Sequence, residues 1–207
     1  MYHDEDSQLV VKPQEVVQTI RDAHEFFTEA RIDERYGSMA LDLIRRYISE
    51  EGMPRELDPF FAAALYLVSR HPWSHPNPLT KTEFASKFRM KESSLEWYTE
   101  SIVEKLDFII LHDKNHLPFF IDSQGTISSV MYSVVRMSVG EAVVNSIVRG
   151  SPVSSHELTE RIVDQLCDVV KIIPPAFQHE LRGVIRNRIE AESERLTEKL
   201  GGREAVL

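Results

Sequence analysis

The sequence predicts an all-α protein: a five-helix bundle around a buried central helix, followed by further helices. Three observations support this fold class. Apolar residues recur at three- and four-residue spacing along most of the 207-residue chain, as on the inward face of a helix. The stretch Phe60 to Val68, FFAAALYLV, has no polar residue, and a helix that is apolar all round is buried all round. Only Phe108 to Asp122 has a β-like pattern, which indicates one short hairpin at most.

Local signals set the bounds of the first three helices. Proline is favoured at the first helical position, so we expect a helix over Pro13–Arg31. A second helix is expected over Arg35–Glu50, with Gly52 as its stop. Asp58 is the expected N-cap of the central helix, 58–71.

A pair of helices and a hairpin come next. Thr80 and Glu83 have the spacing of a capping box, which predicts a short helix up to Phe88. A longer helix is expected over 92–107. Two apolar runs that flank a polar turn then predict the hairpin 108–122, in which Pro118 would confine the second strand to an edge.

The remainder of the chain is expected to be helical from Thr126 onwards. Breaks are expected near 150–152 and 174–175, and the last helix over 176–200. The domain organisation that follows is a flexible tail over 1–12, a helical domain over 13–122, a C-terminal helical region over 123–200 that packs on this domain, and a flexible tail over 201–207.

Residues 14–107 show a family resemblance. Five helices with an Ala-rich buried third one and a short-turn-long pair at the end resemble a cyclin-box repeat. They are similar to the repeats of transcription factor B, a general transcription factor of archaea with a eukaryotic relative. The stretch FAAALYLVSR resembles the family's third helix. LTKTEFASKFRMKESSLEWYTESIVEKL resembles its helix-turn-helix, with Phe84, Ala85 and Phe88 before the turn and Leu95 after it.

Two departures limit what the resemblance implies. The zinc ribbon that precedes these repeats in the family needs several cysteines, and this chain has one. A second clear repeat is also missing. The resemblance therefore implies a scaffold that binds protein or DNA. Our expectation is a non-enzymatic cyclin-fold module that works in transcription through protein contacts, with no cofactor.

A winged-helix DNA-binding regulator is the alternative. Helices 58–71, 81–88 and 92–107 and the hairpin 108–122 also occur in that order in a winged helix, where the hairpin would be the wing and the long helix would enter the major groove. The formal net charge of −9 disfavours DNA as a partner. Residues 127–207 include ten basic and eleven acidic residues, and residues 1–126 include 14 basic and 22 acidic ones. Neither part therefore has a basic excess.

The helix 92–107 contains the residues that we expect to bind a protein partner. Glu92, Glu96, Glu100 and Glu104 recur every four positions and form an acidic stripe, which would repel a phosphate backbone. Trp97 lies nearly opposite the inward residues of this helix. It is either covered by the C-terminal region or exposed as an anchor for a partner, because tryptophan is enriched at interface hot spots.

Basic residues that could contact nucleic acid gather at two places. The candidates are Lys81, Lys87, Arg89 and Lys91 around the turn before helix 92–107, and Arg182 and Arg186 on the last helix. Pairing with nearby carboxylates such as Glu190 and Glu192 is the alternative role for the two arginines.

No catalytic or metal-binding motif is apparent. Two pairs of histidines have a spacing of four, His71 with His75 and His112 with His116. Both pairs lie in expected loops, and a spacing of four brings two side chains to the same face only in a helix. The single cysteine, Cys167, lies on an apolar helix face and is expected to be a buried hydrophobic residue. The N-terminus resembles no signal peptide, and no apolar run approaches about 18 residues, so we expect a cytoplasmic protein with no membrane contact.

Overall fold

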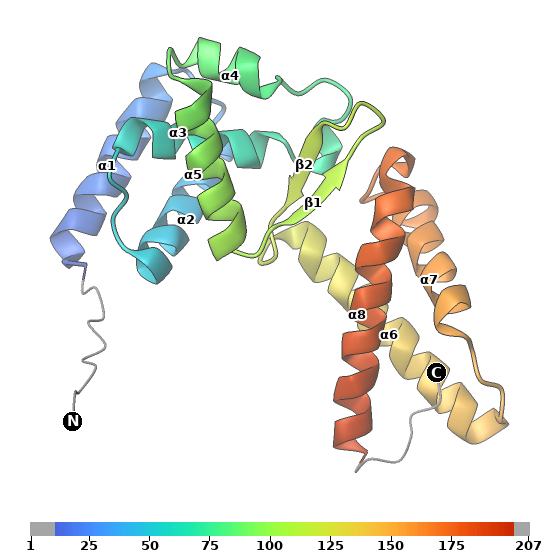
Figure 1. The fold of residues 1–207 in the computed structure, drawn as a ribbon. Helices are drawn as coiled ribbons and strands as arrows, with labels where there is room; N and C mark the ends of the chain where they lie inside the picture. Colours follow the sequence, from blue (N-terminus) through green and yellow to red (C-terminus); the bar gives the residue numbers. More distant parts are fainter. Residues whose placement is uncertain (1–10, 201–207) are drawn as a thin grey trace, which may run out of the picture. The chain divides into compact units, whose positions relative to one another are not determined.

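The computed structural model describes residues 11–200. The expected tail 201–207, and all but Val11 and Lys12 of the tail 1–12, lie outside the described residues. The chain divides into two compact units, which we call unit 1 (up to Phe108) and unit 2 (from Ile109). Helices and one two-stranded hairpin make up the ordered elements of both, which confirms the all-α fold class (Figure 1).

Over residues 11–108, unit 1 contains five α-helices and one short 3-10 turn. Their bounds are α1 Pro13–Glu29, α2 Glu34–Glu51, α3 Leu57–Ser69, η1 Pro72–Ser74, α4 Lys81–Lys87 and α5 Glu92–Lys105. The expected stop of α2 is confirmed, because Gly52 has a φ of 86°, which favours glycine. The capping box is confirmed too. Thr80 Oγ1 accepts a hydrogen bond from the Glu83 N–H, and the Glu83 carboxylate accepts one from the Thr80 N–H.

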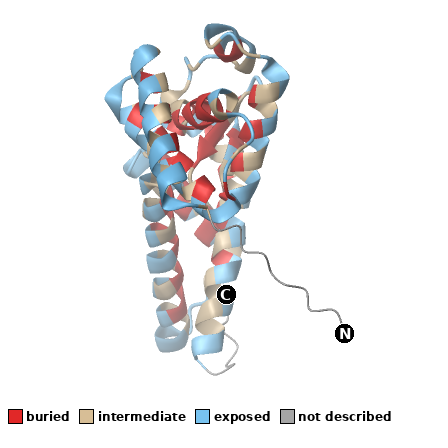
Figure 2. Ribbon diagram, turned by 90° about the vertical axis from the view of Figure 1, so that its left-hand side faces the viewer, coloured by how far each residue is buried: buried red, intermediate tan, exposed pale blue. Residues whose placement is uncertain are grey.

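The central helix α3 is buried along its whole apolar run. Every residue from Phe60 to Val68 is buried, and α1, α2 and α5 pack on this helix. Buried residues accordingly gather about α3 inside unit 1 (Figure 2). The prediction that this helix is surrounded on all sides is therefore confirmed.

The start of α3 differs from the expectation. The helix begins at Leu57 with Glu56 at the N-cap, so Asp58 lies in the first turn and is not the cap. The first N–H groups of a helix have no partner within it, so Pro59 is tolerated anywhere in the first turn. The proline therefore does not fix the first residue.

A buried arginine joins α3 to the Pro-rich loop that follows it. Arg70 is only 1% exposed, and its guanidinium donates to the Leu79 carbonyl. The same guanidinium lies over the ring of Tyr66, 5.4 Å from the ring centroid. A hydrogen bond and a ring contact offset part of the cost of burying this charge.

Unit 2 begins with the hairpin and continues with three long helices. The strands are β1 Ile109–His112 and β2 Pro118–Ile121, paired antiparallel with Ile109 opposite Ile121. The helical elements are α6 Thr126–Arg149, α7 Ser155–Asp164, a π-helical turn Gln165–Val169, a 3-10 turn Pro175–Phe177 and α8 Gln178–Lys199. Gly150, with a φ of 63°, ends α6 at the expected break.

The hairpin packs against the helices of unit 2. Leu111, Phe119 and Ile121 are buried in the same apolar core as residues of α6, α7 and α8. The ring of Phe119 lies 4.9 Å from that of Phe177. The sequence places the hairpin at the end of the first domain, whereas the structure places it in unit 2, because its apolar face needs the helices there to cover it. The packing of the C-terminal region on the first domain stays a prediction.

Helix α6 is unusually long and apolar. It has 24 residues, and its most apolar 18-residue window has a mean hydropathy of 1.2, which by length and composition alone would suffice to cross a membrane. Such a helix is weak support for a membrane span, because the core helix of a globular unit has the same composition. Of that window, 39% is buried against unit 2. The expectation of no membrane contact remains a prediction.

Candidate partner-binding site

The fold of unit 1 turns one face of α5 inwards and leaves Trp97 on the outside. Leu95, Tyr98, Thr99 and Ile102 are buried, and α5 packs on α3 and α4. Trp97 is 58% exposed. The helical repeat places residue 97 away from the inward positions 95, 98 and 102, so a helix that buries those residues must expose this one. The sequence leaves open whether Trp97 is covered by the C-terminal region or exposed, and the structure shows that it is exposed.

The indole of Trp97 is held by its neighbour along the helix. The rings of Trp97 and Tyr98 are perpendicular, with centroids 4.7 Å apart, a favourable edge-to-face geometry. Tyr98 is itself fixed, because its hydroxyl oxygen accepts a hydrogen bond of 2.9 Å from the Glu56 N–H. An exposed aromatic side chain that already rests on a fixed ring loses little conformational freedom when a partner binds.

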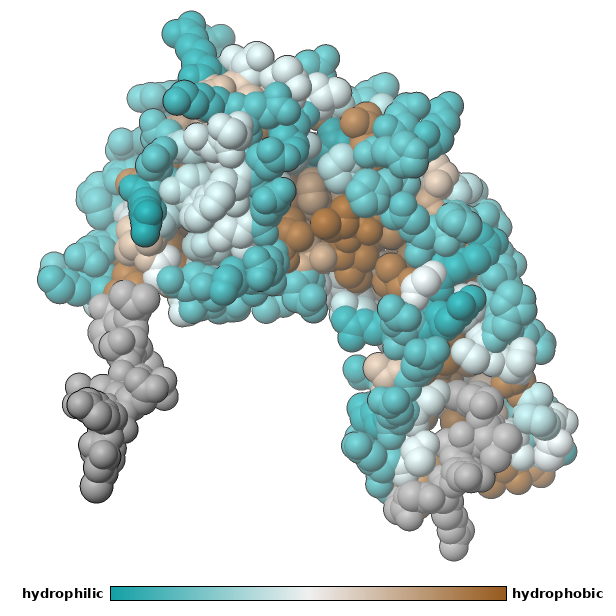
Figure 3. Space-filling model, viewed as in Figure 1, coloured by the Kyte–Doolittle hydropathy of each residue, from teal (hydrophilic) through white to brown (hydrophobic). Residues whose placement is uncertain are grey.

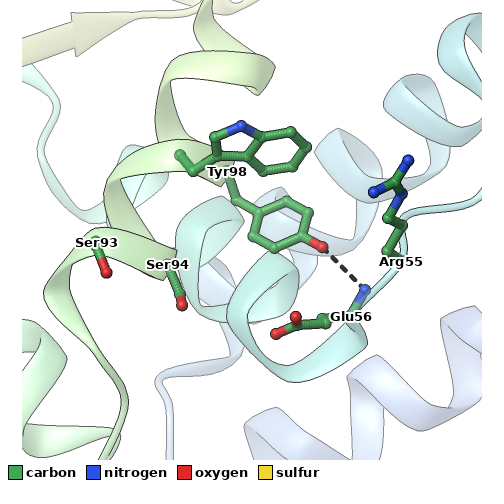
Figure 4. A pocket seen from close by; sticks show the side chains of 6 residues that line it. Arg55, Glu56, Ser93, Ser94 and Tyr98 are labelled. Atoms are coloured by element: carbon green, nitrogen blue, oxygen red, sulfur yellow. Dashed lines mark hydrogen bonds between the residues drawn. The ribbon is translucent and has the colours of Figure 1, made fainter.

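An open pocket adjoins Trp97. It is lined by Arg55 and Glu56 from the segment between α2 and α3, and by Ser93, Ser94, Trp97 and Tyr98 from α5. Arg55 lies across the pocket from Ser93 and Ser94, and the Tyr98 hydroxyl points between them toward the backbone of Glu56 (Figure 4).

The chemistry of the pocket suits a polypeptide ligand. An indole offers a large apolar face and one N–H donor, and the guanidinium of Arg55 offers several donors in a plane. The two serine hydroxyls donate or accept. A peptide could present an apolar or aromatic side chain to Trp97, a carboxylate or carbonyl oxygen to Arg55, and a backbone polar group to the serine hydroxyls.

The structure divides the acidic stripe into two parts. Glu96 accepts from the Nζ of Lys81, and Glu92 accepts a hydrogen bond of 2.9 Å from Thr82 Oγ1, so both hold α4 against α5. Glu100 and Glu104 are exposed to solvent. Only the second half of the stripe is therefore a freely presented acidic surface.

The basic candidates of unit 1 do not form one patch of free cations. Lys81 is paired with Glu96, and the Nζ of Lys87 lies 5.8 Å from the ring centroid of Phe88. Arg89 and Lys91 are exposed in the turn between α4 and α5, where Arg89 has a φ of 53°. Two exposed cations next to the start of an acidic helix are a weak attraction for a phosphate backbone.

The two arginines of unit 2 have different surroundings. Arg182 Nε lies 2.9 Å from Glu160 Oε1, an ion pair that joins α7 to α8 and lowers the pKa of that carboxyl. Glu190 and Glu192 are not the partners of Arg182, because residues eight and ten positions on lie beyond its reach along α8. Glu192 pairs with Arg195 instead. Arg186 is exposed and also helps to lower the pKa of Glu160.

Two of the histidines, His71 and His112, contact neighbouring residues, and Cys167 lies in the core. Within residues 11–200, no three side chains of the metal-binding types come close enough to hold an ion. Burial lowers the pKa of His71, which stacks on Tyr36. The Glu180 carboxylate accepts a hydrogen bond of 2.8 Å from the His112 N–H. Cys167 is buried as predicted, and burial, with help from Asp168, raises the pKa of its thiol to about 11.

Sequence reasoning identified one residue of the pocket and missed five. Ser93 and Ser94 precede Trp97 by four and three positions, so helical spacing alone indicates that they share its side of α5. Arg55 and Glu56 had no such signal, because the packing of α3 on α5 brings them there. Tyr98 belongs to the buried face of α5, and its position in the sequence gives no signal of a pocket.

Comparison with known proteins gives no family for this chain. No family model matches the sequence, and no curated protein matches it either.

Proposed function

We propose that this protein is a non-enzymatic cyclin-fold interaction module associated with transcription, and that a protein partner binds at Trp97. The observation that carries the proposal is the exposed indole, supported by a fixed tyrosine and bordered by the pocket of Arg55, Ser93 and Ser94. Large exposed aromatic residues next to a pocket are typical of interface hot spots.

The cyclin-like part of the proposal is supported by the order and burial of the helices. Five helices, of which the third is Ala-rich and fully buried, precede the hairpin, as the resemblance to the repeats of transcription factor B implies. The link to transcription comes from that resemblance alone. The pocket lies where α5 meets the segment before α3, so a partner would contact two parts of the bundle.

DNA is the less favoured ligand. Glu92 and Glu96 lie on the helix that a DNA-binding protein of either family would place at the duplex, and Glu100 and Glu104 are exposed beside them. The hairpin that a winged helix would use as its wing contributes three buried side chains to the core of unit 2. The winged-helix alternative stays a prediction that a DNA titration would test.

The test is a capture experiment with a matched pair of tryptophan variants. The wild-type protein, Trp97→Ala and Trp73→Ala would be used as baits in an extract of the source organism. Trp73 is 59% exposed, so its replacement removes a similar exposed surface elsewhere in unit 1. We expect a component of the transcription apparatus to be retained by wild type and Trp73→Ala and lost with Trp97→Ala. The purified pair should show at least about thirtyfold weaker binding, the factor that corresponds to a loss of ~2 kcal/mol at a hot spot.

Two results would refute the proposal. The first is a partner that binds Trp97→Ala as tightly as wild type. The second is tight binding of duplex DNA that weakens steeply with salt and is lost on replacing Arg89 and Lys91, which would favour the winged-helix alternative.

A further inference from the structure

Helix α6 has apolar side chains on two opposite faces, and unit 2 covers only one. The buried face includes Met131, Val135, Val139 and Ala142, which lie in the core with residues of α7 and α8. On the opposite face Met137, Val144 and Val148 are 65%, 57% and 74% exposed. Hydrophobic side chains are visible at the surface at the C-terminal end of this helix (Figure 3). A run of exposed apolar residues on one helix face indicates a surface that binds another molecule.

The exposed face of α6 has the spacing of a coiled-coil seam. Val130, Met137 and Val144 are seven residues apart, and Ser133, Gly140 and Ile147 each follow one of them by three. These are the a and d positions of a heptad. Val130 is partly buried against the core of unit 2, so the exposed apolar members are Met137, Val144 and Ile147. A Cβ placed on Gly140 would meet nothing within 4 Å, so the backbone of another helix could approach there closely.

Charges beside this seam select its partner. Arg136 and Glu141 are exposed and lie at the g and e positions that flank the seam. In a parallel pair of identical helices, each g residue meets the e residue five positions further along the other chain. Arg136 of one copy would then lie next to Glu141 of the other, twice per dimer. In an antiparallel pair g meets g and e meets e, so Arg136 of one copy would not lie next to Glu141 of the other.

We propose that the exposed face of α6 is a homodimer interface, in which α6 of two copies pairs in parallel. The seam outside the core runs from Ser133 to Ile147, about 21 Å along the helix axis. That is shorter than the coiled coils that hold free peptides together, but α6 is already folded against α7 and α8 and does not pay the entropy of helix formation on pairing. The inference is independent of the site at Trp97, because it concerns residues of unit 2 alone.

A lipid surface is the competing occupant of an apolar helix face. Helices that lie on membranes have Lys and Arg beside the apolar stripe, because bilayer surfaces are commonly anionic. Here Glu141 borders the stripe between Met137 and Val144. Arg136 borders the same stripe, so the exposed face has one charge of each sign and no basic excess that would favour anionic lipid, whereas the two charges are complementary between two copies.

The first test measures the mass of the full chain against concentration by analytical ultracentrifugation. We expect a monomer–dimer equilibrium in wild type and a dissociation constant about tenfold higher or more in Val144→Glu. Val17→Glu is the matched control, because Val17 is 61% exposed on α1 of unit 1, and it should leave the equilibrium unchanged. Far-UV circular dichroism would show that both variants remain helical.

The second test distinguishes parallel from antiparallel pairing. Arg136→Glu and Glu141→Arg should each weaken the dimer, and the double variant should restore it, because the exchange regenerates both ion pairs only in a parallel dimer. Ser133→Cys and Ile147→Cys should each form a disulfide with a second copy of the same variant. In an antiparallel pair d positions lie opposite a positions, so cross-links would form only in a mixture of Ser133→Cys and Val144→Cys.

Three outcomes would overturn the proposal. These are a wild-type protein that is monomeric at all concentrations, a dimer that Val144→Glu leaves intact, and cross-links found only in the cysteine mixture. Binding to vesicles of anionic phospholipid that Val144→Glu abolishes, in a protein that stays monomeric, would assign the face to a membrane surface instead.

Discussion

The helices α3 and α6 have nearly continuous apolar sequences, yet the two units use them differently. All nine residues of the apolar run of α3 are buried by α1, α2 and α5. In α6, by contrast, the face opposite the core of unit 2 exposes Met137, Val144 and Val148. The number of helices around each one explains the difference. A central helix with neighbours on every side has no free face, whereas a helix of a three-helix packing is covered along one side only.

The comparison shows that apolarity all round a helix has two meanings. In unit 1 it marks the middle of a bundle, and in unit 2 it belongs to a helix that contributes one face to a core and leaves other apolar side chains exposed. The flanking residues tell the two apart. The apolar run of α3 has no charged residue, while Arg136 and Glu141 border the exposed face of α6. Charges beside an apolar face belong to an interface that water reaches at its rim.

The largest expected effect contrasts the two helices directly. Leu65→Ala in α3 should lower the free energy of unfolding by ~2–5 kcal/mol, because the cavity is enclosed on all sides. Val144→Ala in α6 should change it by less than about 0.5 kcal/mol when the protein is monomeric, since this side chain is mostly exposed. Urea denaturation of dilute protein measures both. Equal losses would mean that the outer face of α6 is covered in the monomer.

The same denaturation curves test how the units are coupled. Both tryptophans, Trp73 and Trp97, belong to unit 1, so their fluorescence reports on that unit alone, whereas far-UV circular dichroism reports on both. The sequence predicts that the C-terminal region packs on the first domain and that unfolding is one cooperative transition. Two curves that coincide would agree with this prediction, and a later or earlier transition seen by circular dichroism alone would contradict it.

A smaller effect is expected at alkaline pH and only in unit 2. Burial raises the pKa of the Cys167 thiol to about 11, above its value in the unfolded chain. The unfolded state therefore loses its proton first as the pH rises. The stability from the neutral buried thiol is fully present below about pH 8.5, the ordinary thiol pKa, and is lost progressively up to pH 11.

The loss should reach at most about 3 kcal/mol, since one pKa unit corresponds to 1.36 kcal/mol. Cys167→Ala is the control, because it keeps every other titrating group. We expect its stability to fall less steeply between about pH 8.5 and 11 than that of wild type. Parallel curves for the two proteins would show that the thiol ionises as easily in the folded chain as in the unfolded one.

The smallest expected effects compare one helix cap from each unit. Thr80 caps α4 reciprocally with Glu83, whereas Ser154 Oγ caps α7 by accepting one hydrogen bond of 3.1 Å from the Glu157 N–H. Thr80→Ala should cost about 1–2 kcal/mol and Ser154→Ala about 0.5–1 kcal/mol, because the Thr80 hydroxyl both accepts from the Glu83 N–H and donates to the Glu83 carboxylate, whereas the Ser154 hydroxyl makes one bond. Thermal unfolding of the two variants shows which one loses more stability. A larger loss for Ser154→Ala than for Thr80→Ala would contradict the prediction.

Local sequence signals were sufficient for most of the secondary structure. The capping box at Thr80, the stop at Gly52 and the hairpin with Pro118 all occur as expected, because each depends on residues a few positions apart. The burial of α3 followed from composition, since a helix without a polar face is stable in water only when it is surrounded. Asp58 was wrong as the cap because a proline is accepted at several positions of a first turn.

Tertiary structure alone decided which surfaces the helices leave open. The sequence placed Trp97 on the outer side of α5, but only the packing of α3 on α5 brings Arg55 and Glu56 next to it and forms the pocket. Likewise, the sequence indicated only that the chain is helical from Thr126 onwards, and the packing of the hairpin, α7 and α8 decides which face of α6 is covered. Periodicity is a property of neighbours along the chain, whereas burial depends on segments that meet only in the folded state, so the sequence determined the elements and the fold determined their free faces.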